Sequence, residues 1–426
     1  MIAILSLVAL VVAVIIGIIR PKINIGVLSI GFAFIIGFFF LHLKEKEITA
    51  LFPSSLFLML VFITFLFSLA AENGTLQKIT NILVGKVRAK PVLLPLVFFA
   101  LTFFLSAIGP GNIAAVALIA PIGMVLAYNL KLSPFLMAIM ICTGANAGAF
   151  SPIAPTGVIS TGLIQKIGIE STLVPWIIFG ASALIQSLSA ILAYFGFLFY
   201  FKKFRKGEET ASVEISHIIG DGKEVFSAKQ KITLIALVLL LVLIIFFKVP
   251  LILSAFFATA ILLFLDAADS ETALKNMPWD AILLVSGVSL LIGMLDKAGG
   301  LDLATTLIAN ISDVSYINAM LALITGIISA YSSSSGVVLP AFIPLIPELI
   351  EKMGGGDLNR MAVAVAVGSH MVDVSPLSTL GAICISAMPT ASSAVKNKLF
   401  RQLMLWGLSM AVVGTILSFL ILDLPY

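Results

Sequence analysis

Two short polar stretches interrupt long apolar runs of this sequence, and their residues could bind a small anion or a cation. Gly144–Gly157 reads G-A-N-A-G-A-F-S-P-I-A-P-T-G, and Gly368–Gly381 reads G-S-H-M-V-D-V-S-P-L-S-T-L-G. The two stretches are offset by 224 residues, so Asn146 corresponds to His370 and the Ser-Pro dipeptides coincide. A helix break at membrane depth is tolerated where the freed backbone groups are buried in protein or line a polar cavity. Two matched breaks of this kind indicate the binding site of a secondary transporter.

Two further polar stretches are related by nearly the same offset. Ser106–Asn112 reads S-A-I-G-P-G-N, and Ser329–Gly336 reads S-A-Y-S-S-S-S-G. The Gly-Pro-Gly sequence cannot continue a helix. We therefore predict that each stretch is the tip of a hairpin that enters the membrane without crossing it.

Neutral donors and acceptors dominate the two tips and the two breaks, which contain no Lys or Arg. Exposed helix N-termini carry partial positive charge and suit an anion, whereas carbonyl, hydroxyl and amide oxygens suit a small hard cation such as sodium. Any one Ser, Thr or Gly could instead serve ordinary helix packing. The predicted anion contacts are Asn112, Ser151, Thr156, Ser334, Ser335, Ser375, Ser378 and Thr379. The predicted cation ligands are Ser106, Gly109, Gly111, Asn146, Ser329, Ser332, Ser333 and His370.

His370 and Asp373 are ionisable residues within the second break. Such groups are costly inside a membrane span and are usually functional. Because they are three residues apart, they share a helix face if the helix persists between them. They could form a proton or coupling-ion site, or a structural hydrogen-bonded pair. The corresponding residues of the first half are Asn146 and Ala149, so the ionisable pair breaks the symmetry.

The composition places these stretches in a membrane protein. Hydrophobic residues make up 60% of the chain and charged residues 11%, whereas soluble domains average about 25% charged residues. The chain is therefore predicted to be an all-α polytopic membrane protein. It has no G-x-x-x-x-G-K-[ST] motif for phosphate binding, so we do not expect it to be an ATP-driven pump. We expect no cofactor other than sodium as a coupling ion.

Apolar runs of about 20 residues predict two halves built on one plan. Residues 1–200 comprise spans at 2–19, 23–42 and 55–71, an amphipathic arm at 75–90, a hairpin at 92–128, a broken helix at 134–166 and a span at 174–200. After a linker at 201–231, residues 232–426 comprise spans at 232–247, 249–265 and 279–295, an arm at 301–312, a hairpin at 316–350, a broken helix at 360–389 and a span at 399–422. Each half then crosses the membrane an odd number of times. The second half is therefore inverted, and about ten transmembrane helices are predicted.

The basic residues support this topology. On the traced path, 18 of the 25 Lys and Arg residues lie on one side, which the positive-inside rule makes cytoplasmic. The linker is then cytoplasmic, and both termini lie outside. The first apolar run is followed, not preceded, by Arg20 and Lys22, which favours a retained span over a signal peptide. We predict a multi-pass protein of the cell (inner) membrane.

The order of hairpin, broken helix, hairpin and broken helix resembles the ion transporter superfamily, which includes divalent anion/sodium symporters, arsenite permeases and citrate carriers. Within it, G-A-N-A-G-A-F-S-P-I-A-P-T-G and V-D-V-S-P-L-S-T-L-G-A look most like the MatC-type dicarboxylate carriers. This resemblance implies a homodimer of scaffold and transport domains that moves its substrate by an elevator-like motion. In the symporters both tips carry a Ser-Asn-Thr motif that contacts sodium and carboxylate. Here the tips read Gly109-Pro110-Gly111-Asn112 and Ser332-Ser333-Ser334-Ser335, so only Asn112 and the serines correspond.

Three functions fit these residues. The leading hypothesis is symport of a small dicarboxylate or similar organic anion with a cation, favouring sodium over protons. The second keeps the fold and makes the chain a cation/proton antiporter or an oxyanion permease of the arsenite type, using His370 and Asp373. The third is an intramembrane protease with Ser335 beside His370, although an aspartyl mechanism requires two carboxylates and only Asp373 is evident. We therefore expect a transporter and not an enzyme, with no nucleic-acid partner.

Overall fold

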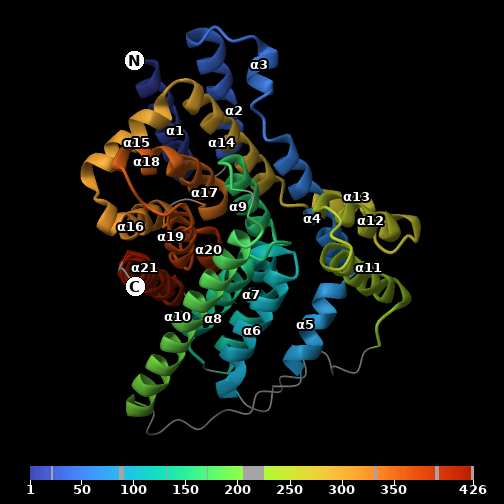
Figure 1. The fold of residues 1–426 in the computed structure, drawn as a ribbon. Coiled ribbons are helices and arrows are strands. Elements are labelled where there is room, and N and C mark those ends of the chain that lie inside the picture. The colour runs from blue at the N-terminus through green and yellow to red at the C-terminus, as the bar shows by residue number, and fades with distance from the viewer. Residues whose placement is uncertain are drawn as a thin grey trace.

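The computed structural model is all-helical over the residues that it describes (Figure 1). These are residues 1–20, 23–85, 91–130, 132–169, 171–204, 225–330, 333–388 and 393–423. Ser332, one of the predicted cation ligands, lies outside these ranges, as does most of the predicted linker.

The first half of the chain is a series of apolar helices with short connections. Their bounds are α1 (Ile2–Ile19), α2 (Ile25–Ile35), α3 (Glu45–Thr49), α4 (Ser54–Glu72), α5 (Thr75–Gly85), α6 (Leu94–Ala107), α7 (Gly111–Asn129), α8 (Pro134–Ala149), α9 (Pro155–Lys166) and α10 (Val174–Phe204). Proline begins both α8 and α9, as expected at a first helical position, where no partner for the N–H group is needed. Residues 150–154 separate these two helices and lie within Gly144–Gly157, the stretch that we call the first break.

The second half follows a similar order. Its helices are α11 (Ala228–Ile245), α12 (Leu251–Phe264), α13 (Ser270–Lys275), α14 (Trp279–Lys297), α15 (Gly300–Ile311), α16 (Ile317–Ser329), α17 (Leu339–Phe342), α18 (Ile346–Met353), α19 (Leu358–Met371), α20 (Thr379–Ser386) and α21 (Ser393–Ser418). A π-helical turn, Ser334–Val338, precedes α17. Residues 372–378 separate α19 from α20 and lie within Gly368–Gly381, the stretch that we call the second break.

Five helical segments within the described ranges are long and apolar enough to cross a membrane. A sixth is added if α14 and α15, which are bent by 86° at their junction, count as one span. Shorter apolar helices, among them α6, α8, α12 and α16, fall below that length. The chain therefore has the helices of a multi-pass membrane protein. The expected number of about ten crossings includes the shorter helices and stays a prediction.

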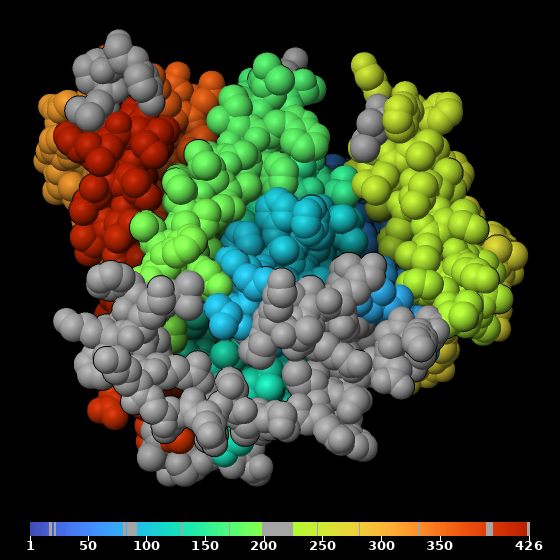
Figure 2. All heavy atoms as spheres, turned by 90° about the horizontal axis from the view of Figure 1, so that it is seen from below, coloured from blue at the N-terminus to red at the C-terminus, as the bar shows by residue number. Residues whose placement is uncertain are grey.

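Helices from the two halves of the sequence pack against each other. α2 packs along α14, and α12 packs along α4. A β-carbon at Gly26 would collide with the backbone of α14, and one at Gly287 would collide with Gly26 itself, so glycine permits this close approach. Viewed from below, α21 (red) and α11 (yellow-green) lie on opposite sides of α6 (cyan) and α10 (green) (Figure 2).

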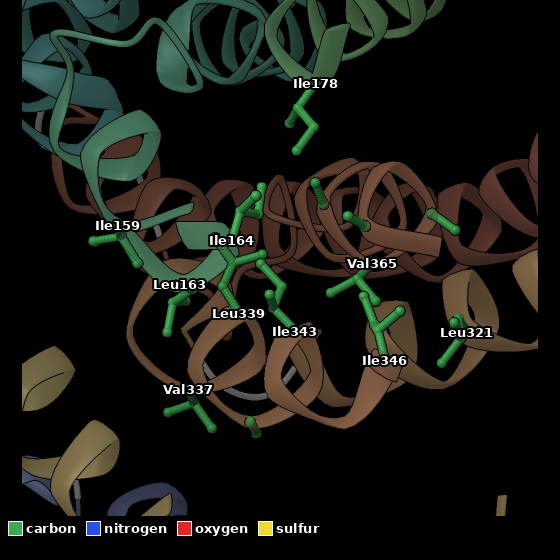
Figure 3. Close-up of a cluster of buried hydrophobic side chains, with 14 of the residues drawn as sticks. Ile159, Leu163, Ile164, Ile178, Leu321, Val337, Leu339, Ile343, Ile346 and Val365 are labelled. Carbon is green, nitrogen blue, oxygen red and sulfur yellow. The ribbon is translucent and has the colours of Figure 1, made fainter. Parts of the chain in front are cut away.

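A hydrophobic core joins the first break to the second hairpin. Leu163 and Ile164 of α9 lie beside Leu339 and Ile343 of the second hairpin (Figure 3). All four side chains are at most 2% exposed. A second core surrounds α6, α7 and α8 and includes residues of α20. The first core thus packs α9 against the helical turns that follow the serine-rich tip of the second hairpin.

Candidate functional site

A cavity of about 400 Å³ lies between the first break, the two hairpin tips and helices α4 and α14. None of the described residues that line it is charged. Its polar lining consists of Thr64, Asn112, Thr156, Asn276, Ser333 and Ser335. A second cavity of about 250 Å³ shares part of this lining and extends to Glu72, at the end of α4.

The first tip is held against the first break by glycine. Gly111 has φ of 81°, in the left-handed region that favours glycine. A β-carbon there would lie 2.8 Å from Pro155 Cδ. Gly111 begins α7 and Pro155 begins α9. The N-termini of two helices therefore border the cavity, and a helix N-terminus carries partial positive charge that suits an anion.

A hydrogen bond between two residues that line the cavity joins the first break to the second tip. The hydroxyls of Thr156 and Ser335 lie 3.0 Å apart. The neighbouring Ser333 also lines the cavity, and its hydroxyl accepts the N–H of Gly336 at 3.1 Å. Of the predicted anion contacts, Asn112, Thr156 and Ser335 therefore come together at one cavity. The tip residues Gly111 and Ser333, predicted as cation ligands, line the same cavity.

A chain of amides runs from this cavity to the second break. Asn112 donates to Asn146 Oδ1 at 2.9 Å, and Asn146 donates to the carbonyl of His370 at 3.0 Å. Gln186 on α10 donates to the same carbonyl at 3.0 Å. All three amide side chains are at most 6% exposed. The predicted cation ligand Asn146 is therefore occupied by protein groups and links the two breaks.

Asp373 lies in an oxygen-rich cluster under the second tip. Its Oδ1 lies 2.6 Å from Ser334 Oγ, 3.2 Å from Ser378 Oγ and 3.3 Å from Ser329 Oγ. The backbone carbonyls of Ser369 and Asp373 lie 3.1 Å from the hydroxyls of Ser334 and Ser378 respectively. A carboxylate, three hydroxyls and two carbonyls form the kind of oxygen set that a small hard cation takes. Within the described ranges, no group of three or more His, Cys, Asp and Glu residues could hold a metal ion.

His370 does not share the environment of Asp373. α19 ends at Met371, so the helix does not persist between the two residues, and the condition for a shared face is not met. His370 Nδ1 lies 3.1 Å from the Ala366 carbonyl and 3.1 Å from Ser369 Oγ. Its ring lies 4.4 Å from that of Phe150 in the first break. These contacts engage Nδ1 and the ring, whereas the buried Nε2 has no hydrogen-bond partner among the described residues.

The remaining predicted site residues lie outside the cavity lining. Ser375 Oγ donates to the Ala330 carbonyl at 3.1 Å, and Thr379 is exposed at the start of α20. Ser106 is buried beside Gly148. A β-carbon at Gly109 would collide with the ring of Phe67.

Glycine packs against a serine carbonyl in both breaks. A β-carbon at Gly157 would collide with the carbonyl of Ser151, and one at Gly381 would collide with the carbonyl of Ser375. Both serines are at most 7% exposed. Their backbones are therefore fixed by equivalent contacts, one in each break.

Sequence reasoning missed the apolar wall of the cavity. Leu60 of α4 and Leu284 of α14 line it, but nothing in the sequence separates them from leucines that face lipid. It also missed Gln186, whose amide in the middle of the mostly apolar α10 was a usable signal. The protease pairing is not formed, because Ser335 bonds to Thr156 whereas His370 bonds to Ala366 and Ser369.

Comparisons with known proteins agree with this fold. Residues 1–149 match a family model described as the N-terminus of the dicarboxylate carrier protein MatC. The crystal structure of the YdaH transporter of Alcanivorax borkumensis superposes with a TM-score of 0.56 at 12% identity, covering 88% of this chain and 86% of that one. No curated protein matches the chain by sequence. The predicted resemblance to MatC-type carriers is thus confirmed over residues 1–149, and the chain is a multi-pass membrane transporter and not an enzyme.

Proposed function

We propose that this chain is a secondary active transporter that couples uptake of a small dicarboxylate, or a similar organic anion, to a cation, with sodium favoured. The observation that carries the proposal lies in the second tip. Ser333 and Ser335 line the uncharged cavity, while Ser334 between them contacts the carboxylate of Asp373 at 2.6 Å. One tripeptide therefore touches both the candidate anion site and the candidate cation site.

This arrangement gives coupling a physical basis. A cation held by Asp373, Ser329 and Ser378 would also be coordinated by Ser334. This contact would fix the backbone of the second tip. Ser333 and Ser335 would then be ordered for the anion, so each ligand would raise the affinity for the other. The match of residues 1–149 to a dicarboxylate carrier model supports a dicarboxylate as the anion. The N-termini of α7 and α9 supply the donors that such an anion needs.

Paired contacts support two inverted repeats, residues 1–200 and 232–426. α2 packs on α14 while α12 packs on α4, an exchange of helices between the halves. The Gly157–Ser151 contact has its counterpart in Gly381 and Ser375. On this basis we extend the proposal to an elevator-like motion of the hairpins and breaks against the remaining helices. We also propose that the protein is a homodimer in the cell (inner) membrane, with both termini of each chain outside.

Uptake by reconstituted protein tests the proposal. Proteoliposomes should accumulate a radiolabelled C3 or C4 dicarboxylate when a sodium gradient points inward, and much less when potassium replaces sodium. Uptake that follows a proton gradient and ignores sodium would make protons the coupling ion. The absence of dicarboxylate uptake under every gradient would refute the function.

The buried Asp373 supports one alternative, a cation/proton antiporter of the same fold. A single carboxylate among hydroxyls could exchange a proton for a cation. In that case cation flux would proceed without any organic anion, and Asp373→Asn would abolish proton-linked exchange.

A further inference from the structure

The polar groups of the candidate anion cavity are unevenly distributed among the elements that line it. Its hydroxyls and helix N-termini belong mainly to the two tips and the first break, whereas α4 and α14 contribute mostly apolar residues, which we call the wall. The wall consists of Leu60 of α4 and of Ile282, Leu284 and Val285 of α14. Leu284 reaches the second tip itself, because a β-carbon at Gly336 would collide with its side chain.

The wall offers a ligand almost no hydrogen-bonding group. Thr64 is the polar residue of α4 in the lining, and its hydroxyl donates to the carbonyl of Leu60 at 2.7 Å. Asn276, the other polar residue outside the tips and the first break, is exposed. Leu60, Ile282 and Val285 are at most 2% exposed, and their side chains offer no hydrogen-bond partner to a ligand group pressed against them.

From this asymmetry we infer that the site selects dicarboxylates with an unsubstituted or alkyl-substituted carbon chain and rejects those that carry a hydroxyl. The inference rests on the proposed function and names the subclass of its substrate. Both carboxylates are bound by the tips and the first break, and the carbon chain lies against Leu60 and Leu284. A hydroxyl on that chain would lose its water against the wall without gaining a partner. Apolar pockets discriminate against an added hydroxyl by up to about a hundredfold.

Equilibrium binding to the purified full-length protein in detergent, with sodium present, tests this inference. Isothermal titration calorimetry compares two pairs of anions that differ by one hydroxyl: malonate with tartronate, and succinate with malate. We expect the hydroxylated member of each binding pair to have a Kd at least about tenfold higher.

Leu284→Thr and Leu284→Val form a matched pair of variants, because Thr and Val have nearly the same shape and differ by a hydroxyl in place of a methyl group. Leu284→Val should keep the preference for the unhydroxylated anion. Leu284→Thr should reduce that preference to about threefold or less, since its hydroxyl can partner that of the ligand.

Two results would overturn the inference alone: equal affinities within each pair for the unmodified protein, or the same preference in Leu284→Thr and Leu284→Val. A folded protein that binds neither member of either pair would overturn the proposed function and the inference together. Thermal unfolding of the same samples shows whether the protein is folded.

Discussion

The two helix breaks have similar backbones and different chemistry. Each packs a glycine against a serine carbonyl, at Gly157 in the first break and at Gly381 in the second. The first break is neutral and presents Thr156 to the cavity. The second contains Asp373, buried among hydroxyls. Where the second half has this carboxylate, the first has Ala149. The shared backbone thus supports two different sites, and we expect only the second to bind a cation.

Removing the negative charge of Asp373 from the second break should have the largest effect on transport. Asp373→Asn preserves the shape of the side chain but leaves a bound cation without its negative ligand. We expect sodium-dependent uptake in proteoliposomes to fall by roughly a hundredfold, because unpairing a buried charge costs on the order of 3 kcal/mol. Asp313→Asn, which alters an exposed turn, is the matched control and should transport normally. Normal sodium dependence in Asp373→Asn would place the cation elsewhere.

The shared backbone can be tested with a pair of glycine variants. In Gly157→Ala and Gly381→Ala the new methyl group meets a serine carbonyl, and overpacking of a tight contact costs typically 1–3 kcal/mol. Both variants should therefore unfold at a lower temperature, by similar amounts. Gly162→Ala in α9, where the nearest atom would lie 3.7 Å from the new carbon, should be neutral or slightly stabilising. A large effect at only one break would contradict their equivalence.

The sequence predicts those features of the two breaks that depend on helix-breaking and polar residues. Its apolar composition predicts the helical membrane fold. The Ser-Gly-Pro clusters predict which residues meet at the cavity, among them Thr156 and Ser335. Thr156 and Ser335 do line one cavity, because polar groups and prolines at membrane depth have few places where they can be satisfied.

Other parts of the site cannot be predicted in this way. Leu60 and Leu284 have the same chemistry as leucines that face lipid, so only the packing of α4 and α14 identifies the cavity wall. The separation of His370 from Asp373 depends on where α19 ends, at Met371. Helix ends are poorly defined by sequence pattern when the residues on both sides are small or polar.

The amide chain that joins the two breaks should have an intermediate effect on stability. Asn146→Ala removes bonds to both Asn112 and the carbonyl of His370. We expect a loss of about 2–3 kcal/mol, since each bond contributes about 1 kcal/mol and the Asn112 amide is left without this partner. Gln186→Ala removes one bond to a carbonyl that keeps Asn146, so its loss should be nearer 1 kcal/mol. Denaturant unfolding in detergent measures both. Equal losses of stability in the two variants would show that Asn146 is not the central link of this chain of amides.

The bond between the first break and the second tip should have the smallest effect on stability. Thr156→Val and Ser335→Ala each remove one hydroxyl of a pair 3.0 Å apart, and a typical hydrogen bond contributes about 0.5–1.5 kcal/mol. A double-mutant cycle should give a coupling energy of that size, since the two residues are in contact. The same double-mutant cycle can be measured as changes in anion affinity. It then tests whether the anion needs both hydroxyls. If it bridges them, each single variant weakens binding and the double variant weakens it by less than the sum of the two. Additive losses would mean that the anion contacts Thr156 and Ser335 independently, and that the neutral break binds it without help from the second tip.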